Sequence, residues 1–380
     1  MPTEEQSTEF PKRVMFVIHS MHGGGSERQM SYLVNEIASR AQTSLVTLDE
    51  TGNDAYPLNP RIERFGLKLA SNQGGFFRGA IANMRRMASL RKRIRSWRPD
   101  VVVSFCDSTN ILTLLACPRK IPVLISERSD PRRQTLGRSW ELMRKRSYPR
   151  CRMCVTQTTE VSDYLTSQHW VAADKIVVIP SAIRAPELNL ESLDRQRDLL
   201  QLKTLIFVGR LSKEKRIDRL LKAWASLKEH HAEWQLRIVG DGSERNALQR
   251  LATELKLEQS VQWALWSDDV WSALSTSHAY CLVSDYEGFP QAMLEAMASG
   301  LPVAVLDCSP AIRKTIAHEV NGLVIPSEDQ IASTLQRILS NDALRKHLGQ
   351  AAFHRARNFE WSTIAPQWIS AIGSAVRSMS

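Results

Sequence analysis

The chain has 380 residues, of which 43% are hydrophobic and 24% charged, and its formal net charge is +10. This length allows two domains of ordinary size, each with its own core. No apolar run approaches the roughly 18 to 20 residues that span a bilayer, and the acidic start at Glu4 and Glu5 is unlike a signal peptide. We therefore expect a cytoplasmic protein.

Six cysteines are scattered along the chain, at positions 106, 117, 151, 154, 281 and 308. Scattered cysteines in a long chain indicate reduced core thiols rather than a disulfide framework. Cys151 and Cys154 have the spacing of metal ligands, but no second Cys or His pair lies at a zinc-site distance. We expect one buried and one incidental thiol there, and no metal site.

The excess of basic over acidic residues lies entirely in the first half of the chain. Through residue 190 there are 28 Lys and Arg against 18 Asp and Glu, whereas the remainder has 22 of each. The densest segment, 83–98, has helical periodicity, with an apolar stripe at Met84, Met87, Leu90, Ile94 and Trp97. We expect the stripe to pack on the domain's own sheet, while the arginines at 85, 86, 91, 93 and 95 face an anionic membrane. Nucleic acid is not an expected partner, because no recognition motif accompanies the charge.

Short apolar runs alternate with helical segments along the chain. Strands are predicted in the first half at 14–18, 44–48, 101–105, 123–126, 153–156 and 176–179, and in the second half at 204–208, 235–239, 261–263, 279–283, 303–306 and 323–325. This alternation predicts an α/β protein with two Rossmann-like, doubly wound domains that face a central cleft. A polar linker is expected over 187–202, and the predicted domains are 1–186 and 187–356, followed by a C-terminal helix at 357–380.

A glycine loop, Gly23-Gly24-Gly25, follows the first strand and precedes a helix predicted over 26–38, with Ser26 as its N-cap. The loop is a weak match to the dinucleotide-binding fingerprint Gly-x-Gly-x-x-Gly, because Arg28 stands at the position of its last glycine. Only Asp49 supplies an acidic residue after the next strand. His19 and His22 lie close to this loop in the sequence, and either is a candidate for contact with a substrate.

The most informative segment runs from Ser284 to Pro302. A predicted strand leads into a loop that contains Glu287, and Pro290 stands where the first residue of a helix is expected. The free N–H groups near Gln291 and Ala292 form a positive helix end suited to a phosphate, and Glu295 lies about one and a half turns further on. A nucleotide sugar carries a hydroxyl-rich sugar, a phosphate and a ribose diol, which match these three parts.

The run Glu-Gly-Phe-Pro-x4-Glu-Ala-Met-x2-Gly-x-Pro resembles the signature of retaining glycosyltransferase family 4, of the two-Rossmann-domain GT-B type. The segment from Gly209 to Arg216 resembles the family's Gly-Arg-Leu-x-x-x-Lys-Gly, with Arg216 in place of the usual glycine. The closing helical stretch resembles the segment in which the family's chain returns to its N-terminal domain. The resemblance implies catalytic roles for Arg210, Lys215 and Glu287, and donor contacts from Gly24, Gly25, Trp266, Gly288, Phe289, Pro290, Gln291, Ala292 and Glu295.

The acceptor side departs from the family pattern. Many members have a His in the segment that corresponds to 126–131, whereas this chain reads Ser-Glu-Arg-Ser-Asp-Pro. Glu127 or Arg128 is a candidate to replace it, and Ser-Glu-Arg resembles a subgroup of hexosamine transferases in surface-polysaccharide assembly.

The resemblance implies transfer, with retention, from a nucleoside-diphosphate sugar, with UDP-hexose or UDP-N-acetylhexosamine as the expected donor. The acceptor is expected to be a glycan or a lipid-linked glycan in surface polysaccharide or glycolipid biosynthesis, at the inner face of the membrane. We expect no metal or other cofactor, since Arg210, Lys215 and the helix end can stabilise the leaving phosphate and no Asp-x-Asp occurs. The alternatives are a sugar-nucleotide hydrolase or epimerase on the same fold, and a non-catalytic nucleotide-sugar-binding protein.

Overall fold

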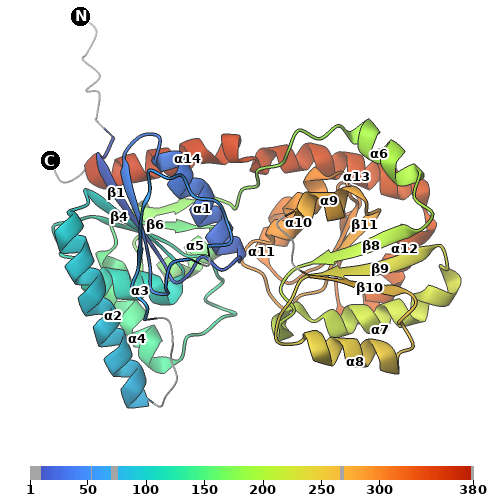
Figure 1. Ribbon diagram of the computed structural model, residues 1–380, viewed down its shortest axis with the longest axis horizontal. Helices are drawn as coiled ribbons and strands as arrows, with labels where there is room; N and C mark the ends of the chain where they lie inside the picture. Colours follow the sequence, from blue (N-terminus) through green and yellow to red (C-terminus); the bar gives the residue numbers. More distant parts are fainter. Residues whose placement is uncertain (1–9, 53, 70–75, 266–268, 378–380) are drawn as a thin grey trace, which may run out of the picture. The chain divides into compact units, whose positions relative to one another are not determined.

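The computed structural model describes residues 10–52, 54–69, 76–265 and 269–377 (Figure 1). The chain forms two compact units. The first consists of Met1–Ser181 together with Ile364–Ser380, and the second of Ala182–Thr363. Each unit is built around one parallel sheet with helices on both faces, so the predicted α/β class with two Rossmann-like domains is confirmed.

The first unit contains a seven-stranded sheet in the order β3-β2-β1-β4-β5-β6-β7. All paired strands are parallel, and the strands are β1 (Arg13–Ile18), β2 (Gln42–Thr47), β3 (Glu63–Gly66), β4 (Val101–Phe105), β5 (Val123–Ser126), β6 (Met153–Thr156) and β7 (Ile176–Val178). Its helices are α1 (Gly25–Ile37), α2 (Phe76–Trp97), α3 (Asp107–Ala116), α4 (Arg138–Ser147) and α5 (Thr159–Ser167), with short 3-10 turns η1 (Tyr148–Arg150) and η2 (Ala173–Lys175).

The second unit contains a six-stranded parallel sheet in the order β10-β9-β8-β11-β12-β13. Its strands are β8 (Lys203–Val208), β9 (Trp234–Val239), β10 (Val261–Ala264), β11 (Ala279–Leu282), β12 (Val303–Leu306) and β13 (Leu323–Ile325). Its helices are α6 (Leu190–Asp198), α7 (Ile217–Leu227), α8 (Arg245–Glu254), α9 (Val270–Ser275), α10 (Gln291–Ala298), α11 (Pro310–Thr315), α12 (Ile331–Ser340) and α13 (Asp342–Ala356). The 3-10 turns are η3 (Lys213–Lys215), η4 (Lys228–His230), η5 (Glu328–Gln330) and η6 (Arg357–Phe359).

The central strands are buried along their whole length because helices cover both faces of each sheet. Val101, Val102 and Val103 of β4 have no exposed surface, and neither do Leu205, Ile206 and Phe207 of β8. A parallel sheet covered on both faces has near-continuous apolar strands, and this pattern made the strands easy to predict. No helix in the described ranges is long and apolar enough to cross a membrane.

The last helix, α14 (Trp361–Arg377), supplies residues to the first unit from Ile364 onward. Trp368 is buried and its ring lies 5.4 Å from that of Phe105, at the end of β4. The closing stretch is not one continuous helix, since η6 separates α13 from α14.

Two local features differ from expectation. β3 was not predicted, since Glu63 and Arg64 make this half-buried edge strand polar. The segment 187–202 is not simply a linker, because it contains α6, whose Asn189 side chain caps the helix by accepting a hydrogen bond from the Ser192 N–H. Arg197 fixes α6 to the second unit by donating to the carbonyl of Ser299 at 2.6 Å.

The cysteines and the basic helix differ in part from expectation. All six cysteines are free, and Cys151 and Cys154 are both buried, so neither thiol is incidental. Leu90, Ile94 and Trp97 pack inward from α2, but Met84 is 56% exposed.

Arg86 was expected to face lipid, but it is buried. Its Nε donates to the carbonyl of Leu69 and its Nη1 to the side chain of Asn83, each at 2.7 Å. Burying a guanidinium requires such partners, which explains why Arg86 turns inward.

In the second unit, the loops after the adjacent strands β8 and β9 interlock. Gly209 N–H bonds to Val239 O, and Leu211 N–H bonds to Asp241 O. Gly240 has a φ of +147°, and a Cβ there would collide with the carbonyl oxygen of Gly209. This close approach fixes the loop that carries Arg210.

We expect Gly240→Ala to lower the free energy of unfolding by roughly 2 kcal/mol or more, because the new methyl group meets rigid backbone at a left-handed φ. Urea unfolding measures the effect. Gly79→Ala is the matched control, since Gly79 lies in α2 with open space around it. This substitution should stabilise the protein by up to about 1 kcal/mol. Equal effects of the two substitutions would contradict this description of the loops.

Candidate functional site

The start of α10 presents the helix end that the sequence predicts. Pro290 is the N-cap, with a φ of −75°, and the helix begins at Gln291, one residue later than expected. The first N–H groups of a helix have no partner within the helix, and the helix dipole makes this end positive. Gln291 is held in place because its side chain donates to the carbonyl of Ala182 at 3.1 Å.

Lys215 and Glu287 meet beside this helix end. The Lys215 Nζ lies 2.6 Å from Glu287 Oε1, and the Ser284 hydroxyl donates to the same oxygen at 2.8 Å. The two side chains are 20% and 10% exposed, so their attraction is less screened than at the surface. The structure thus brings together two residues that are 72 positions apart in the sequence.

The loops that carry Lys215 and Glu287 are also tied together by backbone. Asp285 N–H donates to Glu214 O at 2.8 Å. Arg216 has a φ of +48°, the left-handed conformation in which a glycine is common, and this costs an L-residue about 1–2 kcal/mol. Its guanidinium bonds to Asp218 at 3.0 Å and to Asp285 at 3.3 Å, which offsets the strain. The side chain therefore braces the loop instead of adding a cation beside Lys215.

Arg210 is exposed and makes no side-chain hydrogen bond or ion pair with any residue that the structure describes. Its neighbour Gly209 and the next residue, Leu211, are fixed by the interlocked loops. Arg210 is thus a cation on a rigid backbone with its donors available to a ligand.

The other predicted donor contacts lie on the same loop and helix, except Trp266 and the two glycines of the first unit, Gly24 and Gly25. Gly288 is half-buried, and Phe289 is buried against Phe359 with the ring centroids 5.7 Å apart. Ala292 is half-buried, whereas Glu295 is only 2% exposed, inside the first turns of α10. Trp266 lies outside the described residues.

In the first unit the glycine loop forms the N-terminus of α1. The N-cap is Gly24 rather than Ser26, and Gly25 is the first helical residue. The carboxylate of Glu27 lies so close to Gly24 that a Cβ on Gly24 would collide with it. Gly24 and Gly25 are thus accessible to a ligand only on the side that Glu27 leaves uncovered.

His19 and His22 follow β1 at the same edge of the sheet. Partial desolvation and the charge of Arg86 lower the pKa of His19, so its imidazole is neutral at pH 7 and can exchange hydrogen bonds with a hydroxyl. His22 lies 3.4 Å from Asp49 and is half-exposed.

Glu127 follows β5 and lies in a buried polar cluster. Tyr148 donates its hydroxyl proton to Glu127 Oε2 at 2.7 Å, and Ser129 donates to Oε1 at 3.1 Å. Burial, with a smaller effect of the nearby Asp107 carboxylate, raises the pKa of Glu127 to about 7. Arg144, which is fully buried, reduces this rise and bonds to Glu141 at 3.2 Å. Glu127 can therefore hold or release a proton near neutral pH.

Arg128 points away from this cluster. Its Nη2 donates to the Ser181 hydroxyl at 2.9 Å, and Gln157 bonds to the same hydroxyl at 2.7 Å. The guanidinium also lies 5.3 Å from the centre of the Phe105 ring. Arg128 is 8% exposed, so it acts on the end of β7 more directly than on a ligand.

Sequence reasoning missed Asp107, Arg144 and Tyr148. Asp107 is the first residue of α3, two residues after the end of β4, so the rule that sites lie beyond the carboxyl ends of parallel strands was sufficient to find it. Arg144 and Tyr148 come from α4 and η1, and no local pattern signals their contact with Glu127.

Two family models match the chain. Residues 192–355 match the model described as Glycosyl transferases group 1, and residues 23–185 match Glycosyltransferase Family 4. The chain belongs to this family of glycosyltransferases. It is an enzyme, and the hypothesis of a non-catalytic binding protein is wrong.

Individual relatives agree with the family. The GalNAc-alpha-(1->4)-GalNAc-alpha-(1->3)-diNAcBac-PP-undecaprenol alpha-1,4-N-acetyl-D-galactosaminyltransferase of Campylobacter jejuni is 25% identical over 364 residues, which are 95% of this chain and 98% of the relative. An uncharacterized glycosyltransferase of Haemophilus influenzae is 32% identical over 171 residues, 44% of this chain and only 48% of that relative.

A solved structure is similar along nearly the whole chain. The Anabaena protein HepE, in complex with UDP and glucose, has a TM-score of 0.75 and 15% identity over 95% of this chain and 99% of its own. At this identity the likeness establishes the fold alone.

The raised pKa of Glu127 predicts a pH-dependent stability. The ordinary pKa of a glutamate, taken for the unfolded chain, is 4.5. The contribution of protonated Glu127 to the free energy of unfolding is therefore fully present below pH 4.5 and is lost as the pH rises through about 7. A glutamine side chain at this position cannot titrate, so the wild type should lose on the order of 3 kcal/mol relative to Glu127→Gln between about pH 4.5 and 8. Urea unfolding of both proteins across this range tests the prediction, and parallel pH profiles would contradict it.

Proposed function

We propose that the protein transfers a sugar from a nucleoside-diphosphate sugar to a hydroxyl of an acceptor, with retention at the anomeric carbon. The observation that carries the proposal is the contact of Lys215 with Glu287 at 2.6 Å beside the start of α10. A cation next to a positive helix end favours a diphosphate, and the adjacent carboxylate favours sugar hydroxyls.

The proposed chemistry follows from where charge develops. As the sugar leaves, negative charge accumulates on the diphosphate, and Arg210, Lys215 and the N–H groups of Gln291 and Ala292 stabilise it. Glu287 holds Lys215 in place and orients hydroxyls of the sugar. Glu295 is proposed to bind the ribose diol from within α10. The acceptor attacks from the face that the diphosphate leaves, which gives retention, and these cations need no metal to assist them.

Donor and acceptor are proposed from the relatives. HepE was solved with UDP and glucose, and the Campylobacter jejuni enzyme is named as an α-1,4-N-acetyl-D-galactosaminyltransferase whose acceptor is a PP-undecaprenol-linked glycan. We propose UDP-hexose or UDP-N-acetylhexosamine as donor, and a glycan or lipid-linked glycan of bacterial surface polysaccharide or glycolipid biosynthesis as acceptor. A hydrolase or epimerase would use the same donor site but needs no acceptor, and the family match weighs against it.

A lipid-linked acceptor favours contact with the inner face of a membrane. Arg85, Arg91 and Arg95 are exposed on α2, whereas Arg86 is buried and the Arg93 guanidinium lies 3.6 Å from the centre of the Phe65 ring. Ile81 and Met84 are 46% and 56% exposed on the same helix. We propose that this helix binds anionic lipid through its exposed arginines and these two apolar side chains.

Lys215→Ala is expected to lower the rate of sugar transfer about 100-fold or more, because a charge that stabilises the leaving group is lost. Glu295→Gln should weaken donor binding. Lys213→Ala is the matched control, since Lys213 is exposed two residues earlier and should leave the rate unchanged. Full activity of Lys215→Ala, with folding checked by circular dichroism, would refute the proposed site.

UDP and UDP-sugars should raise the melting temperature by several degrees, and GDP- and ADP-sugars should raise it less. The shift should persist in EDTA, because the proposed donor site holds the diphosphate with protein cations alone. A thermal-shift panel with and without the chelator measures both properties. A shift that EDTA abolishes would overturn the metal-independent donor site.

Binding to anionic vesicles should weaken as salt is added, since exposed arginines are screened within about 10 Å at 0.1 M ionic strength. Co-sedimentation with vesicles measures it, and the variant Arg85→Gln/Arg91→Gln should bind less than Arg40→Gln, an exposed arginine elsewhere in the unit. Binding that salt leaves unchanged, or no binding, would count against the membrane proposal.

A further inference from the structure

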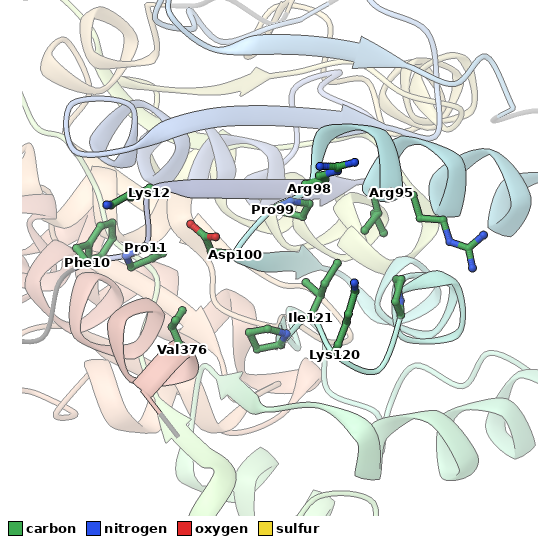
Figure 2. Close-up of a pocket in the computed structure, with 13 residues that line it drawn as sticks. Phe10, Pro11, Lys12, Arg95, Arg98, Pro99, Asp100, Lys120, Ile121 and Val376 are labelled. Atoms are coloured by element: carbon green, nitrogen blue, oxygen red, sulfur yellow. The ribbon is translucent and has the colours of Figure 1, made fainter. Parts of the chain in front are cut away.

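A pocket of about 940 Å³ opens at the opposite edge of the first sheet from Glu127 (Figure 2). It lies at the amino ends of β1, β4 and β5, and its wall also includes the end of α2 and Val376 of α14. The strands between the two edges are four to six residues long, which places this pocket on the order of 15 Å from the carboxyl ends. The sugar-transfer proposal uses none of these residues.

The rim of the pocket is cationic. Lys12, Arg95, Arg98 and Lys120 line it, with Asp100 as the one acidic residue of the lining. Arg95, Arg98 and Lys120 are exposed, and none of them forms an ion pair or side-chain hydrogen bond within the described part of the chain. Asp100 forms no ion pair with them in the described part of the chain, and its carboxylate accepts the backbone N–H of Arg13 at 2.9 Å, so the lining keeps an excess of positive charge.

Arg98 reaches the rim through a strained backbone. It directly follows α2 and has a φ of +54°, where a helix ordinarily ends in glycine. The following Pro99 further disfavours a helical ψ at Arg98. A cationic side chain in this conformation is an outlier of the kind that marks binding sites.

About half of the pocket's lining surface is apolar, and the prolines in it supply no hydrogen-bond donor. Pro11, Pro99, Pro118 and Pro122 line the pocket and have no N–H, and Ile121 and the buried Ile94 add apolar side chains to the lining. Such a surface accepts hydrocarbon without leaving a donor unpaired, but it offers nothing to the edge of a nucleotide base.

We propose that this pocket binds an anionic phospholipid, with the phosphate and glycerol at the cationic rim and the beginning of the acyl chains against the prolines. Charge complementarity favours this occupant, because Arg95 near the end of α2 and Arg98 directly after it both line the pocket, and Arg91 lies one turn earlier on the exposed face of the helix. The inference rests on the proposed membrane contact and is independent of the sugar-transfer reaction.

The test uses the full chain and a soluble probe, dihexanoyl-phosphatidylglycerol below its micelle concentration. Calorimetry should show binding of one molecule per chain, and no comparable binding of dihexanoyl-phosphatidylcholine or inorganic phosphate. Arg98→Gln/Lys120→Gln should weaken binding on the order of twentyfold, at about fivefold per charge. Arg138→Gln/Lys145→Gln removes the same charge from exposed positions of α4, outside the pocket, and should leave the binding of this lipid unchanged.

A second variant distinguishes binding inside the pocket from general attraction to a charged surface. Val376→Trp fills the pocket without changing charge, so it should abolish binding of the soluble lipid while vesicle binding through α2 and UDP-induced stabilisation persist. Equal loss in the pocket and control variants would leave only diffuse attraction and overturn the site. Binding of inorganic phosphate as tight as that of the lipid would also overturn the proposal.

Discussion

The contact between Lys215 and Glu287 is the interaction on which the proposed donor site depends. It joins the loops after β8 and β11, which are neighbouring strands of the second sheet, at 2.6 Å. A partly buried ion pair contributes little net stability unless other bonds complete it, and here Ser284 donates to the same carboxylate oxygen. The pair therefore matters more for where it places the Lys215 cation, next to the loop that leads into α10, than for the free energy of folding.

The surrounding loops are built to keep that position. Gly240 lets one loop approach the backbone of Gly209 so closely that no other residue fits, and this fixes Arg210 and the following turn. Arg216 accepts a left-handed conformation and bonds to Asp218 and Asp285, which braces the turn from outside. Strain and close packing thus occur where the site requires a rigid backbone.

Much of this was predictable from local sequence, and the reason is physical. Strands such as β4 and β8 are continuous apolar runs because both sheet faces are covered, and α10 carries its own start and stop signals in Pro290 and Gly300. The polar edge strand β3 and the docked helix α6 gave no such signal. Their stability comes from distant partners, as in the bond from Arg197 to Ser299.

The contact of Tyr148 with Glu127 could not be predicted from local sequence for the same reason. Tyr148 lies 21 residues after Glu127, in η1, and only the fold brings its hydroxyl to the carboxylate. The first unit therefore has a buried titratable carboxylate at the carboxyl edge of its sheet and a cationic pocket at the amino edge. The proposed acceptor side and the proposed lipid-binding pocket thus lie at opposite edges of the same sheet.

The structure of a UDP complex tests the central claim most directly. The account predicts the β-phosphate within hydrogen-bonding distance of the N–H groups of Gln291 or Ala292 and of the side chains of Arg210 and Lys215. A diphosphate bound elsewhere, with the Lys215 to Glu287 pair undisturbed and distant from it, would contradict the account.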